Sequence, residues 1–308
     1  MTRTAVALGG NAILRGGEGT VEEERRRIRE TRTELRPLHD DGHDLLFTHG
    51  NGPQVGARLL TETEASGEPE PLDVLVAETQ ARIGYHLQLG LGDAFGGRPV
   101  VVLTRTRVDP DDPGFDDPSK PVGPEYTDLD PSSASFPVTE VHGANGRAYR
   151  RVVPSPDPVE VLEADRIRRL AEAAEGPVIC GGGGGVPVVR RDGRPGEYEG
   201  VAAVVDKDRT TRLLAETVGA DSLLFLTDVD AAYRGFGTAD EEPIREATPA
   251  TLRDLLAAGE FGAGTMRPKV EAAAAFVADT GGTALITSPE RLRDALDGDA
   301  GTRVVPAS

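Results

Sequence analysis

The chain has 308 residues, 38% of them hydrophobic, and a mean hydropathy of −0.33, which fits one large globular domain or two lobes. Its 34 basic and 52 acidic residues give a formal net charge of −18, so the surface repels nucleic acid and anionic membranes. No apolar run reaches the roughly 18 residues of a membrane helix, and the N-terminus lacks a signal-peptide cleavage site, so we expect a cytoplasmic protein. The lone cysteine, Cys180, excludes an intrachain disulfide framework and is expected to be a buried structural thiol.

Apolar runs bounded by glycine predict buried parallel strands, and they alternate with amphipathic segments that predict helices. The expected strands are residues 4–8, 44–48, 99–104, 177–180, 222–227 and 283–287. The expected helices are residues 21–39, 72–89, 157–174, 210–218, 249–258 and 266–278. This alternation predicts an α/β fold, a three-layer αβα sandwich around a mostly parallel open sheet.

Two segments interrupt the alternation. Residues 186–205 carry turn signals between apolar runs and predict a hairpin insertion. Residues 108–149 are rich in Pro, Asp, Ser and Gly, and a structureless loop of that length is uncommon inside a compact domain. The segment is therefore either disordered or a small functional lid. Lys120 at its centre favours the lid.

Only three of the basic residues are lysines, which leaves 34 − 3 = 31 arginines. Lysine is a compact, mobile point charge, whereas the guanidinium of arginine is a wide planar fork. A chain that uses arginine so freely is expected to keep lysine where close approach to a phosphoryl group requires it. The alternative is that these lysines survive by drift on the surface. The three are Lys120, Lys207 and Lys269.

Three glycine turns follow expected strands. Gly9-Gly10-Asn11 and Gly50-Asn51-Gly52 each end a strand, where backbone amides can approach an oxyanion, although tight turns alone would also use glycine. The run 181–185 is expected to bring the backbone close to a ligand, with Gly182 and Gly183 as the candidates. None of these turns has the spacing of a P-loop or of a dinucleotide fingerprint, which disfavours both classes.

The strongest local signal is Asp206-Lys207-Asp208 before an expected helix. Lys207 can reach phosphate oxygens, and an adjacent carboxylate can hold the lysine or bind Mg²⁺ through water. The simpler interpretation makes Asp208 the N-cap of the helix. Lys269 is expected in the first turn of another helix, where its charge opposes the helix dipole and calls for an anion such as a phosphate.

Thr227, Asp228, Asp230 and Tyr233 follow the strand at 222–227 and suit ribose, adenine or metal contacts, or else an Asx-type turn. The five histidines show no metal-ligand spacing, and no serine-centred nucleophile elbow is present. Nothing in the sequence calls for covalent catalysis.

Together these residues resemble the carbamate kinases of the amino-acid kinase superfamily. The matching motifs include ALGGNAI (7–13), HGNGPQVG (49–56), LDVLVAETQARIGY (72–85), KPVGP (120–124), RRVVPSPDP (150–158), CGGGGGVPV (180–188), VVDKD (204–208), LTDVD (226–230), MRPK (266–269) and ALITS (284–288). The resemblance implies a homodimer, an N-terminal lobe (1–175) for carbamate with a protruding lid (108–150), and a C-terminal lobe (176–308) for nucleotide. The sequence departs from the family in its acid-rich lid run, 125–136, and in the irregular stretch 230–246.

The resemblance further implies the reaction ATP + carbamate ⇌ ADP + carbamoyl phosphate by direct in-line transfer, with Mg²⁺ carried by the nucleotide, run toward ATP in fermentative arginine degradation. It implies that Lys120, Lys207, Asp208 and Lys269 are catalytic, with Asp208 also an indirect Mg²⁺ contact. Implied acceptor contacts are Gly9, Gly10, Asn11, Gly50, Asn51 and Gly52. Implied nucleotide contacts are Gly182, Gly183, Thr227, Asp228, Asp230, Tyr233 and Met266.

Three other functions stay open at this point: a superfamily kinase with a different small acceptor, a related enzyme serving carbamoyl phosphate synthesis, and a non-catalytic sensor of nucleotide or small anions. The dense acidity, with arginine replacing lysine, also resembles proteins of salt-loving organisms. High salt would screen the repulsion between such a surface and an anionic substrate.

Overall fold

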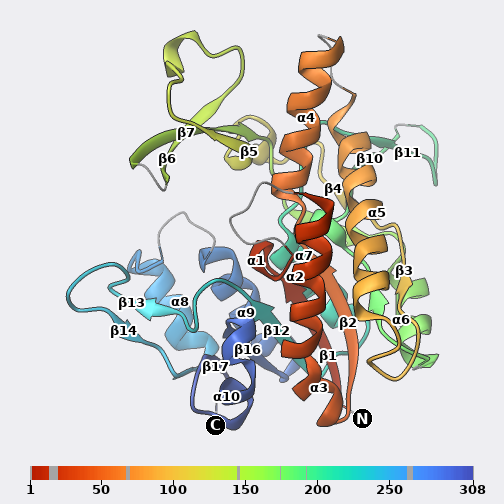
Figure 1. Cartoon of the computed structure of the whole chain (residues 1–308), viewed down its shortest axis with the longest axis vertical. Coiled ribbons are helices and arrows are strands. Elements are labelled where there is room, and N and C mark those ends of the chain that lie inside the picture. Colours follow the sequence, from red (N-terminus) through yellow and green to blue (C-terminus); the bar gives the residue numbers. More distant parts are fainter. Residues whose placement is uncertain are drawn as a thin grey trace.

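The computed structural model describes residues 2–13, 20–66, 70–143, 146–173, 175–191, 193–261 and 266–307. An open eight-stranded sheet forms its centre, in the order β15-β17-β16-β12-β1-β2-β9-β3 (Figure 1). The strands from β12 to β3 are parallel neighbours, β16 pairs parallel with β12, and β17 runs antiparallel to β16. The strand bounds are β1 (Thr2–Leu8), β2 (His43–His49), β3 (Val100–Val101), β9 (Val178–Ile179), β12 (Ser222–Leu226), β15 (Glu246–Ala247), β16 (Thr283–Thr287) and β17 (Thr302–Val304).

Helices cover both faces of this sheet and confirm the three-layer sandwich. One layer contains α1 (Gly10–Ile13), α2 (Val21–Glu34), α3 (Arg36–Asp40), α5 (Leu72–Leu91) and α10 (Leu292–Asp297). The other contains α6 (Ala164–Ala173), α7 (Lys207–Thr217), α8 (Pro249–Ala257) and α9 (Met266–Thr280).

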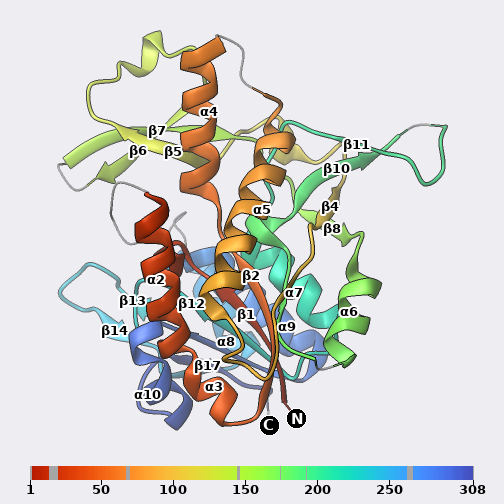
Figure 2. The same ribbon diagram turned by 45° about the vertical axis from the view of Figure 1, so that its right-hand side comes forward.

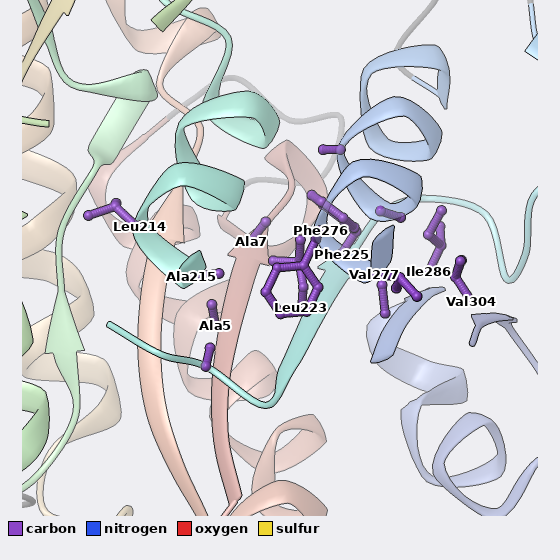
Figure 3. Close-up of a cluster of buried hydrophobic side chains, with 14 of the residues drawn as sticks. Ala5, Ala7, Leu214, Ala215, Leu223, Phe225, Phe276, Val277, Ile286 and Val304 are labelled. Carbon is purple, nitrogen blue, oxygen red and sulfur yellow. The ribbon is translucent and has the colours of Figure 1, made fainter. Parts of the chain in front are cut away.

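The two faces of the sheet are built by alternation along each strand. In β1, Ala5 and Ala7 pack against the second layer, whereas Val6 and Leu8 pack against the first. The core of the second layer is shown in Figure 3, where Phe225 of β12 and Phe276 of α9 lie together. Because both faces are covered, the strands read in sequence as continuous apolar runs, which is why they could be predicted.

Three predicted boundaries were wrong. The expected helix 21–39 is two helices that meet at Leu35, because Pro37 at the start of α3 cannot donate to the preceding turn. The expected helix 157–174 begins only at Ala164, since β8 (Pro158–Val161) occupies its first part. The expected strand 99–104 joins the main sheet only as β3 before the chain leaves for another sheet. Helix α4 (Gly52–Ser66) was not predicted.

A second sheet has the order β11-β10-β4-β8. Its β10 (Val186–Arg190) and β11 (Tyr198–Gly200) form the antiparallel hairpin expected within residues 186–205. Beside β10 lies β4 (Arg105–Val108), which pairs with β8. A two-stranded sheet, β13 (Tyr233–Arg234) with β14 (Glu242–Pro243), gives structure to the stretch 230–246.

The Pro-rich segment forms a third, antiparallel sheet that we call the lid. It contains β5 (Lys120–Tyr126), β7 (Gly146–Val153) and β6 (Val138–Gly143), with short 3-10 turns at Pro113–Phe115 and Pro131–Ser133. In Figures 1 and 2 this sheet lies beside α4, beyond the carboxyl ends of the central strands. The lid expectation is therefore confirmed in its architecture.

The base of the lid is packed tightly on α4. A Cβ atom added at Gly56 would lie 1.8 Å from the Cα of Gly123, so the two backbones touch where both residues are glycine. Val55, Val122 and Val153 bury a small apolar core beneath this crossing. Among the described helices, none is long and apolar enough to cross a membrane.

Candidate active site

A cavity of about 410 Å³ opens at the carboxyl ends of β1, β2 and β12, under the base of the lid. Ligands of open α/β sheets bind at this edge, because loops and helix N-termini converge there. The lining residues are Gly9, Gly10, Ile13, Gly50, Asn51, Gly52, Pro53, Gln54, Val55, Lys120, Pro121, Val122, Arg150, Gly183, Val204, Val205, Asp206, Lys207, Asp208, Thr227, Asp228, Pro268 and Lys269.

All three lysines of the chain line this one cavity. Lys120 comes from the lid, Lys207 from the start of α7 and Lys269 from the first turns of α9. With Arg150 they supply four cations, against the three lining carboxylates of Asp206, Asp208 and Asp228, which leaves 4 − 3 = +1. The cavity is thus locally positive in a chain of net charge −18. Such a site attracts an anion that the rest of the surface repels.

Asp208 holds two of the lysines. Its Oδ1 accepts a hydrogen bond from Lys207 at 2.6 Å and its Oδ2 accepts one from Lys269 at 3.0 Å. Burial alone would raise the pKa of Asp208, but the two ammonium groups outweigh it and keep the pKa well below its ordinary value. Asp208 is therefore an ionised clamp, and its charge compensates Lys269 at the unfavourable end of α9.

Asp206, not Asp208, is the N-cap of α7. Its Oδ1 accepts from the amides of Asp208 at 2.8 Å and Arg209 at 3.2 Å, so the predicted cap at Asp208 was wrong by two residues. The second oxygen of Asp206 accepts from Lys120. Burial acts to lower the pKa of Lys120, but the Asp206 carboxylate raises it above its ordinary value. One carboxylate thus starts α7 and fixes the lid lysine.

The buried His49 and the half-buried Lys207 differ in charge state. Burial lowers the pKa of His49 to about 4, so the imidazole is neutral near pH 7. Its Nδ1 lies 3.1 Å from the carbonyl oxygen of Gly50, which makes Nδ1 the donor. Burial also lowers the pKa of Lys207, while Asp208 opposes that shift. Asp208 therefore favours the protonated form of Lys207.

The glycine turns approach the cavity as expected, but not every amide is available. The amide of Gly9 donates to Leu226 and that of Gly50 donates to Leu8, which continues the strand ladder. The prediction that these two amides cradle the acceptor is therefore wrong in this structure. The amides that begin helices, those of Gly10 and Asn11 in α1 and Gly52 in α4, lack intrahelical acceptors by construction.

The five-glycine run is shaped by packing against protein. A Cβ at Gly182 would lie 2.4 Å from the His49 ring, and one at Gly183 would lie 2.2 Å from the Asn51 side chain. Gly183 also lines the cavity, but Gly182 does not. The buried run thus packs directly against the side chains of His49 and Asn51. A role of Gly182 in binding nucleotide finds no support in this position.

The other expected nucleotide residues separate into two groups. Thr227 and Asp228 line the cavity and are joined by a 2.9 Å hydrogen bond. Asp230 and Tyr233 do not line it; they hydrogen-bond to each other, which raises the pKa of Tyr233 to about 12. Met266 begins α9 and packs against the core of the second layer.

Metal binding by the protein alone finds little support here. Within the described residues, no group of three or more His, Cys, Asp or Glu side chains could hold a metal ion. Both oxygens of Asp208 already accept from lysines, which disfavours the predicted Mg²⁺ contact there. Asp228 is exposed in the cavity wall, and only its Oδ1 accepts a hydrogen bond within the described part of the chain. Cys180 is 2% exposed, and burial raises its pKa, which confirms the structural thiol.

Two polar lining residues were missed from sequence. Arg150 in β7 uses Nε and Nη2 to donate to the carbonyl of Gly123, and it brings the fourth cation. Gln54 in the first turn of α4 is 7% exposed and faces the cavity wall. Both belong to motifs quoted above, RRVVPSPDP and HGNGPQVG. Nothing local marks either residue, because only the fold brings them to the lysines.

Comparisons with known proteins agree with this geometry. Residues 2–288 match the model of the Amino acid kinase family. The chain is 55% identical over 309 residues to the carbamate kinase of Halobacterium salinarum, covering 100% of this chain and 99% of the relative. It is 42% identical over 318 residues to the carbamate kinase of Pyrococcus furiosus, covering 99% of each.

Solved structures give the same result. Carbamate kinase from Giardia lamblia bound to AMP-PNP has a TM-score of 0.87 and 37% identity, covering 99% of each chain. A Giardia lamblia carbamate kinase bound to citric acid has a TM-score of 0.89 at 36% identity, again covering 99% of each. The similarity therefore includes the lid and the hairpin as well as the central sheet.

Proposed function

The chain belongs to the amino acid kinase family and, within it, to the carbamate kinases, and from this premise we propose how its cavity transfers a phosphoryl group between ATP and carbamate. The reaction is ATP + carbamate ⇌ ADP + carbamoyl phosphate. The observation that carries the proposal is the convergence of the chain's only three lysines on one cavity. Carbamate is already a nucleophilic anion, so the site needs no general base.

The transfer depends on charge and position. A carbamate oxygen forms a bond to the γ-phosphorus as the bond from that phosphorus to the β–γ bridging oxygen breaks, and the leaving electron pair stays on ADP. Charge is spread over the three equatorial oxygens in the transition state. Lys207 and Lys269, held at fixed positions by Asp208, neutralise that charge. Because the clamp is preorganised, little rearrangement is needed when the reaction occurs.

Lys120 acts from the lid. Its ammonium reaches Asp206 at the beginning of α7, so it lies over the same end of the cavity as Lys207. Substrate phosphate would compete with Asp206 for this ammonium and draw the lid over the transferring group. Gly10, Asn11, Asn51 and Gly52 contact the acceptor, while Thr227 and Asp228 lie toward the nucleotide.

Mg²⁺ would be carried by the nucleotide phosphates, with water completing most of its coordination. Asp228 is the lining carboxylate best placed to hold it, since one of its oxygens is not used by the described residues. The ion supplies neutralisation of the β- and γ-phosphate oxygens. The N-terminal lobe, residues 1–175, would bind the acceptor and the C-terminal lobe, residues 176–308, the nucleotide.

A homodimer is part of the proposal. Helix α5 packs closely on the edge strand β3, since a Cβ at Gly84 would lie 2.7 Å from Val101. Large apolar side chains are exposed along this edge, between 44% and 54% of their surface. They are Tyr85, Leu89, Val100 and Leu103. A second copy covering this edge would remove them from water. Sedimentation of Leu89→Asp against the unmodified chain would test it, with a shift to monomer expected.

The proposed function is tested by ATP formation from ADP, Mg²⁺ and carbamoyl phosphate. ATP is expected, as is the reverse reaction from ATP and carbamate, and fermentative arginine degradation would use the direction toward ATP. Nucleotide binding without ATP formation would contradict the proposal and point to a different acceptor or to a sensor.

A further inference from the structure

The side chain of Gln54 is held from behind by a buried carboxylate. Its Nε2 donates to Glu24 Oε1 at 3.0 Å, and Glu24 in α2 is only 1% exposed. The other oxygen of Glu24 lies 3.0 Å from both Arg82 Nη2 and His86 Nδ1. Glu24 is therefore a fixed acceptor behind the cavity wall.

This contact decides which way the Gln54 amide faces. A carboxylate accepts hydrogen bonds and donates none, so the amide must turn its NH₂ group toward Glu24 and its carbonyl oxygen away. Within the described residues, no donor contacts Gln54 Oε1. The fully buried side-chain atoms that lack a partner do not include this oxygen, so it is at least partly accessible. Gln54 lines the cavity, and its carbonyl oxygen is the end of the amide that is turned away from Glu24.

Asn51 shows the same arrangement three residues earlier. Its Nδ2 donates to the hydroxyl of Thr79 at 3.0 Å, and that hydroxyl donates in turn to the carbonyl of Leu75 at 2.8 Å. One N–H of Asn51 is thus occupied, and no described donor contacts its carbonyl oxygen. Two buried amides that line the cavity at one strand–helix junction therefore both have a carbonyl oxygen that the described residues do not use.

We infer that Gln54, oriented by Glu24, recognises the amino group of the acceptor, with its carbonyl oxygen accepting a hydrogen bond from an N–H of carbamate or carbamoyl phosphate. This inference rests on the proposed function and names what selects the substrate. Carbamate and acetate differ only in an NH₂ in place of a CH₃. A methyl group would leave a buried acceptor unpaired, and sites built to hydrogen-bond a substrate reject analogues that lack the group.

The positions of the neighbouring groups suit this orientation. A Cβ at Gly50 would lie 3.6 Å from Lys207 Cε, so the Lys207 side chain passes directly beside this junction. Gln54 lies four residues further along the same junction. An acceptor with its oxygen near Lys207 can therefore direct its other substituent toward α4. Glu24 acts only through Gln54 and is a positioning residue.

The test compares carbamoyl phosphate with acetyl phosphate in ATP formation by the full-length protein. Acetyl phosphate is measured as phosphoryl donor and as competitive inhibitor, so that a selectivity ratio is obtained even if its turnover is slow. The variant is Gln54→Met, which keeps length and removes the acceptor. The matched control is Gln88→Met. Gln88 lies near the C-terminal end of α5 and donates to the carbonyl oxygen of Pro99.

We expect Gln54→Met to reduce selectivity for carbamoyl phosphate by about ten-fold or more, through loss of activity with carbamoyl phosphate alone. Gln88→Met should leave the ratio unchanged. Equal losses with both phosphates, or an unchanged ratio, would overturn the inference. If Gln54→Met fails to fold, Glu24→Gln decides: an amide there no longer dictates the orientation of Gln54, so the ratio must fall. A wild-type chain that forms no ATP from carbamoyl phosphate would instead contradict the proposed function.

Discussion

Asp208 and Lys269 form an ion pair at 3.0 Å although 61 residues separate them in the chain. Both are buried, with 3% and 4% of their surface exposed. Burying two charges carries a large desolvation cost, and an ion pair of this kind is weak evidence for a stabilising role. Its position in the wall of the cavity gives a functional reason for it. The pair fixes a cation where a phosphoryl group must be neutralised.

Lys207 is expected to contribute most of the transition-state stabilisation that a single side chain can supply. Lys207→Ala should lower kcat by about 10²- to 10³-fold, the loss seen when one preorganised donor is removed. Arg212→Ala, one turn and a half along α7 in a surface pair with Glu216, is the control and should retain activity. Single-turnover kinetics measures the effect. Near-normal turnover in Lys207→Ala would exclude the proposed role.

Removal of Asp208 should move the alkaline limit of activity. Lys207 must be protonated, so activity is present below its pKa and is lost as pH rises through it. Burial already lowers the pKa of Lys207, and Asp208 opposes this. Asp208→Asn removes the opposing charge, so the alkaline limb of the kcat/KM profile should shift to lower pH. A profile that moves only in height would show that Asp208 does not control this proton.

Asp208 should also make the stability of the protein depend on pH. Its folded-state pKa is depressed, so its contribution is fully present above the unfolded value of about 3.9 and is lost as pH falls from there through the folded-state pKa. The difference in unfolding free energy between the unmodified chain and Asp208→Asn should therefore be constant above about pH 5 and shrink steadily as pH falls below about 4. Denaturant titrations at several pH values would measure it. A constant difference would contradict the clamp.

The glycine crossing of α4 and β5 should be intolerant of any side chain. A methyl at Gly56 would lie 1.8 Å from the Gly123 Cα, and both partners there are backbone. Gly56→Ala should displace the lid and with it Lys120. The main effect should be a higher KM for carbamoyl phosphate, with a smaller effect on the melting temperature. Ala57→Ser, at the exposed neighbouring position, is the control. Unchanged kinetics in Gly56→Ala would show that the lid does not need this contact.

Arg150 should bind substrate in addition to holding the Gly123 carbonyl at the base of the lid. Arg150→Met removes the cavity's fourth cation, and we expect KM for carbamoyl phosphate to rise about ten-fold, the loss of one charge-assisted hydrogen bond. Arg147→Met on the same strand removes a surface pair with Glu140 and should have no such effect. Initial rates at varied carbamoyl phosphate distinguish the two. Equal changes in both variants would point to the lid alone.

Activity should increase with salt. The net charge of −18 repels anionic substrates, and molar KCl reduces the Debye length to about 3 Å. We therefore expect higher kcat/KM and greater stability in multimolar KCl than in dilute buffer. Coupled assays across KCl concentrations would measure it. A maximum in dilute buffer would reject the salt-adapted interpretation of the composition.

The sequence by itself determined the sandwich. Strands buried on both faces, such as β1 with Ala5 and Val6 facing opposite layers, must be apolar at every position, so the pattern is visible locally. The glycine turns were visible because each follows a predicted strand. The three lysines were visible because the chain contains so few among its 34 basic residues.

Tertiary structure alone decided the partners. Lys120 meets Asp206 across 86 residues, and Gln54 meets Glu24 across 30. Sequence placed the helix cap at Asp208, because Asp206 and Asp208 look equivalent before a helix. Only the approach of Lys269 and the lid shows that one carboxylate caps the helix and the other holds two lysines. Hydrogen bonds and ion pairs between distant segments depend on the three-dimensional distance between them. Periodicity along the chain does not indicate that distance.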